Sequence, residues 1–228
     1  MGELVRFASF GGQCEGYLAI PASGSGPGVV VIQEWWGLVP HIESLCDRLA
    51  AEGYVALAPD HYRGVRTTEP DEAGKLMMGL NVAAAADDLA GAAEYLLTRD
   101  EVAGDAVGVV GFCMGGGLAL LAPTTYRRIV ATSAFYPAMP WPDFQPDWSR
   151  YAGKAALVHL AEHDDPAQPG RVAEYGAAIE AAGGSIVVET YPGTSHAFFN
   201  DARPEVYQEA AAALAWRRTL DLFASRLR

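Results

Sequence analysis

Continuous hydrophobic runs alternate with segments of helical periodicity along most of the chain. The runs, rich in Val, Ile, Leu and Ala, cover 28–33, 54–60, 106–112, 128–136, 155–161 and 185–191. The runs at 28–33 and 106–112 are typical of strands buried within a sheet, the first on both faces, and the other runs are predicted as further strands. Helical segments separate several of them, at 41–53, 83–98 and 170–183. This alternation predicts an α/β fold with a mostly parallel central sheet and helices on both faces.

The two ends of the chain add further elements. Segments 4–10 and 15–20, joined around Gly11 and Gly12, predict a starting hairpin, which brings the expected sheet to about eight strands. The last helix carries a core-facing stripe at spacings of four, three and four, formed by Trp216, Leu220, Phe223 and Leu227. Because no internal repeat or linker interrupts the pattern, we expect a single domain over residues 1–228.

Composition narrows the function classes. Half of the 228 residues are hydrophobic, and the formal net charge is −12. That charge disfavours long-range attraction to nucleic acid or to an anionic membrane, so we expect neither as a partner. The N-terminal segment lacks the apolar stretch of a signal peptide, and no apolar run reaches the ~18 residues of a membrane span. These observations predict a cytoplasmic protein.

The segment Gly111-Phe112-Cys113-Met114-Gly115 fits the pattern G-x-nucleophile-x-G between a predicted strand and a predicted helix. A sharp strand-to-helix turn strains the backbone of its middle residue, and small neighbours relieve the crowding. The thiol would then project at the helix N-terminus, where free N–H groups and the helix dipole favour a thiolate. We expect the helix to end near Pro123.

Other readings of these residues are weaker. The glycines around Cys113 match neither the P-loop nor the G-x-G-x-x-G pattern, and a buried structural cysteine is the main alternative. Cys14 and Cys46 fit that structural role, and without a CxxC pair neither a disulfide framework nor a zinc knuckle is indicated. His159 and His163 would lie about 13 Å apart along one strand, too far to share an ion. We therefore expect no metal and no cofactor.

A thiol nucleophile needs a base, and the base needs an orienting group. His196 follows the last predicted strand, and Asp164 and Asp165 follow the preceding one. The order of nucleophile, acid and histidine is that of α/β-hydrolases. We prefer Asp164 as the acid, with Asp165 as the alternative.

The run "VIQEWWG" ends another central strand and is expected to lie beside the strand-to-helix turn at Cys113. We expect Glu34 to line the site and the backbone N–H groups of Trp35 and Met114 to form an oxyanion hole. The expected pocket wall consists of the aromatic residues Trp36, Tyr136 and Phe198. Segment 137–151, with four prolines and two tryptophans, is either an ordered surface loop or a further aromatic wall.

Together, "QEWWG", "APDHYRG", "GFCMGG", the acid after "ALVHL", and "SHAFFN" resemble the dienelactone hydrolase family of α/β-hydrolases, over roughly residues 4 to 225. The resemblance implies an α/β-hydrolase fold and a triad at Cys113, Asp164 and His196. It also implies that Glu34 holds the resting thiol proton until substrate displaces it.

The chain departs from the family where arginines bind the carboxylate of the dienelactone. Asn200 stands in place of one, four residues after the histidine, and the other falls near Pro70. Candidate substitutes are Arg63, Arg66 and Lys75.

A tetrahedral intermediate usually expels a thiolate more easily than an alkoxide. The intermediate formed from a simple alkyl ester would therefore tend to revert to the unreacted ester. The sequence therefore predicts a hydrolase of carboxylic esters with activated leaving groups, or of unsaturated lactones, acting through a thioester with His196 as general base. The expected partner is this small-molecule ester or lactone, and the protein is a monomer or a homodimer. A noncatalytic small-molecule binder on the same fold is the alternative. A redox-sensing thiol is weaker, since no resolving cysteine lies nearby in sequence.

Overall fold

The computed structural model describes residues 2–9, 12–141, 145–167 and 169–227. In these ranges eight strands form one sheet in the order β1-β2-β4-β3-β5-β6-β7-β8. Their bounds are β1 Glu3–Ser9, β2 Gly12–Ala19, β3 Gly26–Ile32, β4 Val55–Pro59, β5 Val102–Phe112, β6 Ile129–Phe135, β7 Ala155–His163 and β8 Ser185–Ser195. β1 and β2 run antiparallel to their neighbours, and β3 to β8 pair in parallel. The mostly parallel sheet predicted from the sequence is confirmed.

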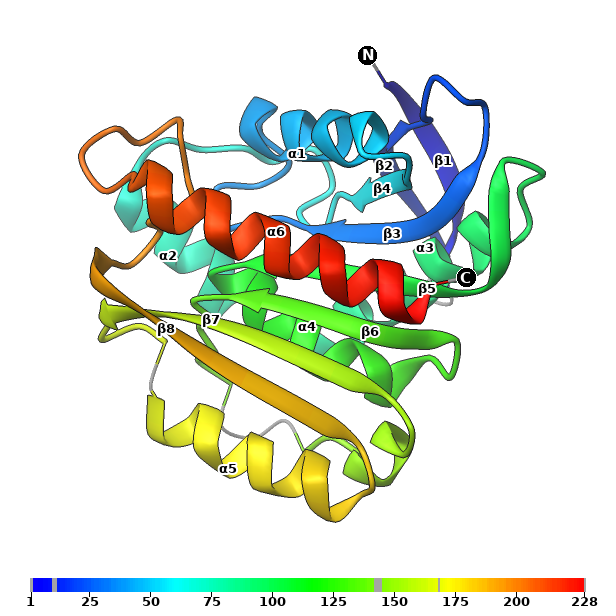
Figure 1. The fold of residues 1–228 in the computed structure, drawn as a ribbon. Coiled ribbons are helices and arrows are strands. Elements are labelled where there is room, and N and C mark those ends of the chain that lie inside the picture. Colours follow the sequence, from blue (N-terminus) through cyan, green and yellow to red (C-terminus); the bar gives the residue numbers. More distant parts are fainter. Residues whose placement is uncertain (1, 10–11, 142–144, 168, 228) are drawn as a thin grey trace.

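Helices cover both faces of the sheet (Figure 1). Their bounds are α1 Pro40–Ala51, α2 Pro70–Met78, α3 Val82–Leu97, α4 Met114–Thr125, α5 Pro169–Ala181 and α6 Glu209–Arg226, with a 3-10 turn at Trp148–Tyr151. α1 and α6 pack on one face, and α3, α4 and α5 on the other. Among the described residues, no helix is long and apolar enough to cross a membrane.

The central strand β3 shows why the hydrophobic runs lack polar alternation. Val29 and Val31 pack into the core layer under α1 and α6, whereas Val30 and Ile32 pack into the layer under α3 and α4. Both faces of the strand are therefore buried, and each successive side chain must be apolar. This buried sheet holds the carboxyl ends of β3, β5, β7 and β8 in fixed relation to one another.

Two elements differ from the sequence prediction. The hydrophobic pattern predicts no helix at 70–78, but α2 begins there at Pro70. Its first turn is acidic and exposed. The helix after Cys113 continues two residues beyond Pro123 to Thr125. Proline has no N–H for the carbonyl of Ala119, and the Thr132 hydroxyl approaches that oxygen at 3.4 Å instead. Phe10 and Gly11, part of the predicted hairpin, lie outside the described residues.

The described part of segment 137–151 packs on neighbouring helices. The Trp141 indole donates a hydrogen bond to the carbonyl of Met77 in α2, and the Trp148 ring packs against Tyr175 in α5. Residues 142–144 lie outside the described ranges. Residues 145–150 are exposed or half-buried, as expected of a surface segment, whereas Ala138, Met139 and Tyr151 are buried.

Candidate active site

Cys113 lies at a strained turn between β5 and α4. Its φ angle is 54°, a left-handed conformation that non-glycine residues rarely adopt. The flanking glycines make this turn possible: a Cβ on Gly111 would come within 2.0 Å of the Gly115 carbonyl oxygen, and one on Gly115 within 2.4 Å of the Ile32 carbonyl oxygen. The turn presents Cys113 at the N-terminus of α4, where the helix dipole favours negative charge.

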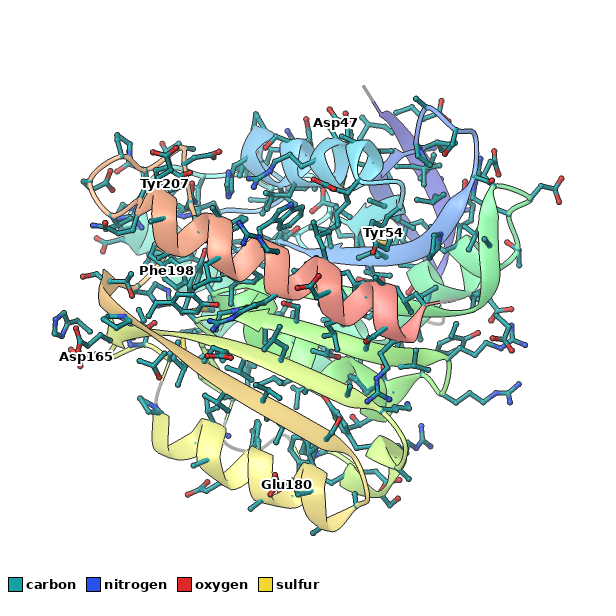
Figure 2. The ribbon with its side chains drawn as sticks, viewed as in Figure 1. Asp47, Tyr54, Asp165, Glu180, Phe198 and Tyr207 are labelled. Carbon is teal, nitrogen blue, oxygen red and sulfur yellow. The ribbon has the colours of Figure 1, made fainter. Side chains whose placement is uncertain are left out.

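His196 and Asp164 meet beyond the carboxyl ends of β8 and β7. The Nδ1 atom of His196 lies 2.7 Å from Oδ1 of Asp164, a hydrogen-bonding distance. The same Asp164 oxygen accepts a hydrogen bond from the Ala167 N–H at 3.0 Å, which fixes the carboxylate in place. Asp165 is exposed and points outward at the edge of the molecule (Figure 2). The structure therefore brings Asp164, the preferred candidate, to the histidine.

The surroundings of His196 favour its protonated form. Burial lowers the pKa of this imidazole, but hydrogen bonds with Asp164 and Cys113 outweigh burial and raise the pKa to about 10. The contact with Cys113 connects the histidine to the predicted nucleophile. Because the folded pKa is raised above 6.5, His196 stabilises the fold fully below about pH 6.5 and loses that contribution as pH rises towards 10.

Carbamidomethylation of Cys113 should lower the pKa of His196. The modification removes both the hydrogen bond and the charge interaction through which Cys113 raises this pKa. The measurement is a pH titration of the labelled imidazole by NMR, with Cys113→Ala as a second way to remove the thiol. An unchanged pKa in both samples would show that His196 and Cys113 do not interact.

Glu34 lies just beyond β3 and is 2% exposed. Its Oε2 accepts a hydrogen bond of 2.8 Å from the side-chain amide of Asn200. Among the described residues its Oε1 makes no hydrogen bond of regular geometry, although the Tyr136 hydroxyl interacts with this carboxyl. Burial raises the pKa of this carboxyl, although His41, His196 and Asn200 each act to lower it. A buried carboxyl with a raised pKa can hold or accept a proton beside the thiol.

A cavity of about 130 Å³ joins these groups. Its lining comprises Glu34, Trp35, Trp36, Met77, Cys113, Ala138, Pro166, His196, Ala197 and Arg203. Trp36 therefore lies in the wall, as predicted.

Two other predicted wall residues, Tyr136 and Phe198, are fully buried and lie behind this lining. The Tyr136 ring packs edge-on against His196, with 5.0 Å between ring centroids, and Phe198 packs on Tyr136 in turn. These rings are not wall residues: they support the histidine from within the core. Trp141 and Trp148 are also absent from the described lining.

Sequence reasoning missed Arg203 and Met77 in the lining. The family resemblance implies an arginine four residues after His196, where this chain has Asn200. Arg203 lies three residues further along the loop. Of the proposed substitutes, Arg63 pairs with Asp88 at 2.8 Å and Arg66 with Glu43 at 3.1 Å, and neither lines the cavity. Met77 belongs to α2, the helix that the sequence analysis did not assign.

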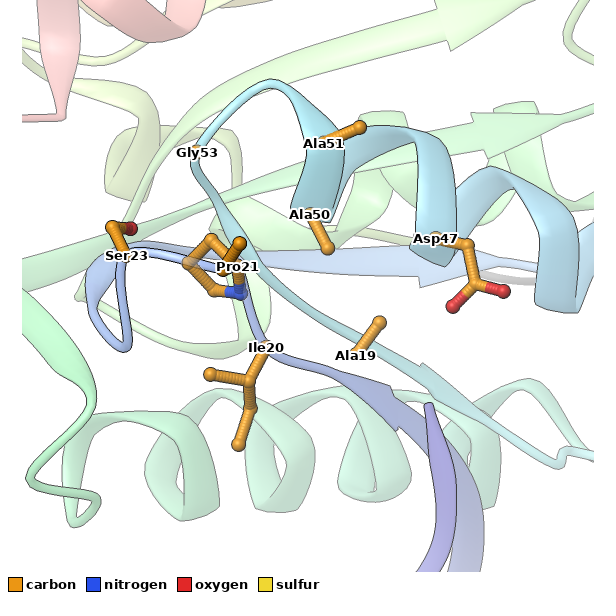
Figure 3. Close-up of a pocket in the computed structure, with 9 residues that line it drawn as sticks. Ala19, Ile20, Pro21, Ser23, Asp47, Ala50, Ala51 and Gly53 are labelled. Carbon is orange, nitrogen blue, oxygen red and sulfur yellow. The ribbon is translucent and has the colours of Figure 1, made fainter. Parts of the chain in front are cut away.

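A larger cavity, of about 530 Å³, lies between the segment after β2 and the end of α1 (Figure 3). Its lining consists mostly of small and apolar residues, namely Ala19 to Ser23, Ala50, Ala51 and Gly53. The ionisable side chain in the lining, Asp47, accepts hydrogen bonds from Tyr17. This cavity shares no described residue with the cavity at Cys113.

Residues 14–227 match the family described as the dienelactone hydrolase family. The chain belongs to this family. "Protein usf" of Aquifex pyrophilus is 34% identical, with 98% of both chains covered, and a protein of Aquifex aeolicus named "Putative carboxymethylenebutenolidase" is 32% identical over the full length of both. The crystal structure of a "Putative Dienelactone Hydrolase" from Klebsiella pneumoniae has a TM-score of 0.85 and 27% identity, with 98% of both chains covered.

These relatives confirm the family resemblance drawn from the sequence motifs and the α/β-hydrolase fold. The protein is accordingly a hydrolase of the dienelactone hydrolase family. Which bond it cleaves, and with which nucleophile, has to be argued from its own residues.

Proposed function

We propose that the protein is a carboxymethylenebutenolidase-type hydrolase that cleaves activated esters or lactones through a thioester on Cys113. One observation carries the proposal: Cys113, at a strained strand-to-helix turn, lines the same cavity as His196. The Nδ1 atom of this histidine lies at hydrogen-bonding distance from Asp164. Nucleophile, base and orienting carboxylate are the three parts of a covalent hydrolytic site.

In the acylation step, the Cys113 sulfur adds to the carbonyl carbon of the substrate while His196 holds the thiol proton. The carbonyl oxygen becomes an oxyanion, which the N–H groups of Trp35 and Met114 stabilise. Met114 opens α4, so its N–H has no carbonyl one turn earlier in the helix, and Trp35 lines the cavity. When the intermediate collapses, the carbon–oxygen bond breaks, and His196 passes its proton to the leaving oxygen.

In the deacylation step, neutral His196 takes a proton from water as the water oxygen attacks the thioester carbon. Collapse of the second intermediate breaks the carbon–sulfur bond and releases the carboxylic acid. Acylation turns the Cys113 sulfur into a thioester and so removes the interaction with Cys113 that helps to raise the pKa of the His196 imidazole. The histidine therefore becomes a free base at the stage that requires one.

Glu34 acts before the first step. In the resting site its buried oxygen accepts a hydrogen bond from the Cys113 thiol; a bound substrate displaces that contact, and the thiol proton then passes to His196 for the acylation step. The raised pKa of Glu34 suits this role, because burial disfavours a bare carboxylate and so favours one that shares the thiol proton.

The test follows p-nitrophenolate release from p-nitrophenyl acetate together with the intact mass of the protein. We expect a burst of phenolate and a mass increase of one acetyl group, which peptide mapping places on Cys113. Cys14 and Cys46 serve as internal controls: both are buried, and burial raises the pKa of both thiols, that of Cys14 to about 12. Acylation of another residue, or turnover that survives complete alkylation of Cys113, would overturn the proposal. Ligand retention without any acylation would instead indicate a binding protein.

A further inference from the structure

The cavity at Cys113 is small, and its sides differ. Its volume is about 130 Å³, whereas cavities that bind small molecules usually have volumes of about 300–1,000 Å³. At Trp36 and Arg203 it adjoins a second cavity of about 340 Å³, whose lining shares these two residues. Met77 and Ala138 line the catalytic cavity and are absent from the lining of its neighbour. Space therefore extends beyond Trp36, whereas Met77 and Ala138 form an apolar wall.

Strand order separates the two ends of a substrate bound at Cys113. In the sheet, β3 lies on one side of β5, and β7 and β8 lie on the other. His196 ends the β8 side, so the leaving oxygen that it protonates lies there. Trp35 follows β3, and its ring packs against α2, where a Cβ on Gly74 would lie 3.9 Å from it. Met77 lies three residues further along α2, so the acyl group that stays on the sulfur faces Trp35 and Met77.

Contacts at both ends hold α2 against this cavity. Before the helix begins, the Thr67 N–H donates a hydrogen bond of 3.1 Å to the carbonyl of Trp36. At the other end, the Trp141 indole donates one of 3.3 Å to the carbonyl of Met77. Since Ala73 is the one buried residue of α2, core packing alone fixes this helix poorly. The position of Met77 therefore depends on these end contacts.

Trp141 is held in turn by α5. One guanidinium nitrogen of Arg171 donates to the carbonyl of Met139 at 3.1 Å, and the other donates to the carbonyl of Trp141 at 3.3 Å. The Arg171 Nε donates to the Tyr175 hydroxyl at 3.2 Å, one turn further along α5. The planar guanidinium fixes the direction of all three hydrogen bonds. Arg171 and Trp141 thus connect α5 to the end of α2 that carries Met77.

Resting on the proposed function, we infer that Met77 sets the length of the acyl chain that the site accepts, and that Trp141 and Arg171 are positioning residues that hold Met77 in place. The substrate class is then activated esters of short-chain acids. A methionine side chain has three rotatable bonds and adapts to its surroundings, so it limits chain length only while its backbone is held.

The experiment compares p-nitrophenyl acetate with p-nitrophenyl hexanoate, after subtraction of the rate measured with Cys113→Ala. We expect the wild type to favour the acetate in kcat/KM. Met77→Ala should raise the hexanoate-to-acetate ratio at least about tenfold, through a gain on the hexanoate. Met78→Ala is the matched control, because Met78 is the next residue of the same helix, is 63% exposed and is absent from the cavity lining. Its ratio should equal that of the wild type.

Two further variants test the positioning residues. Trp141→Phe keeps an aromatic ring but removes the N–H, and Arg171→Met keeps an extended side chain but removes the donors. Each should raise the same ratio about threefold. Arg150→Met is the control, since Arg150 also donates to backbone carbonyls, those of Thr124 and Thr125 in α4, but lines neither cavity. Damage to the fold would lower the rates with both esters, and thermal melting of each variant measures it.

A wild type that favours the hexanoate, or one ratio shared by wild type and Met77→Ala, would overturn the inference about chain length. Ratios of Trp141→Phe and Arg171→Met equal to that of Arg150→Met would overturn the positioning roles. Acetylation of Cys113 by p-nitrophenyl acetate would still support the proposed function in either case.

A second measurement needs no hydrolysis, and so it tests Met77 even if no ester acylates Cys113 and the proposed function fails. Cys113 is alkylated with iodoacetamide and with N-hexyl iodoacetamide, and intact mass follows both rates. A larger hexyl-to-parent rate ratio in Met77→Ala than in Met78→Ala would support the inference. Equal ratios in the two variants would contradict it.

Discussion

Cys113→Ala should lower kcat for p-nitrophenyl acetate by at least about 10⁴-fold, the order of loss seen when a covalent nucleophile is removed. Without the sulfur no thioester forms, and the oxyanion-stabilising groups and substrate binding alone give little acceleration over water. Steady-state kinetics with active-site titration measure the change. The fold should persist, because the substitution leaves the left-handed backbone at position 113 and both flanking glycines in place.

Cys46→Ala provides the control for this substitution. Cys46 is fully buried in α1 and lines neither the catalytic cavity nor its neighbour. Like Cys113→Ala, the substitution Cys46→Ala removes one buried sulfur atom. We therefore expect kcat to change less than about twofold, even if the free energy of unfolding falls by ~1 kcal/mol. Comparable losses of kcat in the two variants would mean that Cys113 acts through packing and not as a nucleophile.

Asp164→Asn should lower kcat/KM by about 10²–10⁴-fold. The amide preserves the shape of the side chain but removes the charge that orients and stabilises the His196 imidazolium. It also removes a group that raises the pKa of His196, so the basic limb of the pH–rate profile should shift to lower pH. Steady-state kinetics from pH 5 to 10 measure both effects.

Asp165→Asn is the neighbouring control, since it changes the same functional group one residue away. Asp165 is exposed, points outward at the edge of the molecule (Figure 2) and does not line the cavity, so kcat/KM should remain within about twofold of the wild type. Equal losses in the two variants would exclude a specific role for Asp164. The comparison also tests the choice between adjacent aspartates that the sequence left open.

The central strands of this fold could be predicted because a strand buried on both faces has a continuous run of apolar residues. β3 over 28–32 and β5 over 107–112 are continuous apolar runs, covered on both faces by helices, whereas the first half of β5 is exposed or half-buried. α2 has no such run: among its residues, only Ala73 is buried, and its first turn is acidic. Short exposed helices are held by local capping and a few contacts, which hydrophobic periodicity does not register.

Local sequence and chain order were enough to predict which residues form the centre of the candidate site. The glycines around Cys113 indicate a strained elbow, and the order of acid and histidine follows from strand order. The wall could not be predicted in the same way. Tyr136 was expected to face substrate and instead supports His196 from behind, whereas Arg203 reaches the cavity from a loop whose path depends on tertiary packing. Which side of a turn faces a cavity is decided by the whole fold and not by the turn itself.

The hydrogen bond between Glu34 and Asn200 joins residues 166 positions apart, and this separation bears on how the protein matures. Ribosomes add roughly 5–20 residues per second, so the amide is synthesised roughly 10–30 s after the carboxyl that it binds. During most of that interval the nascent chain can form β3 to β5 and the turn at Cys113, while His196 has not yet been synthesised. Closing so long a loop is slow. Translation that pauses just before residue 196 would leave a chain with most of its sheet but without this histidine.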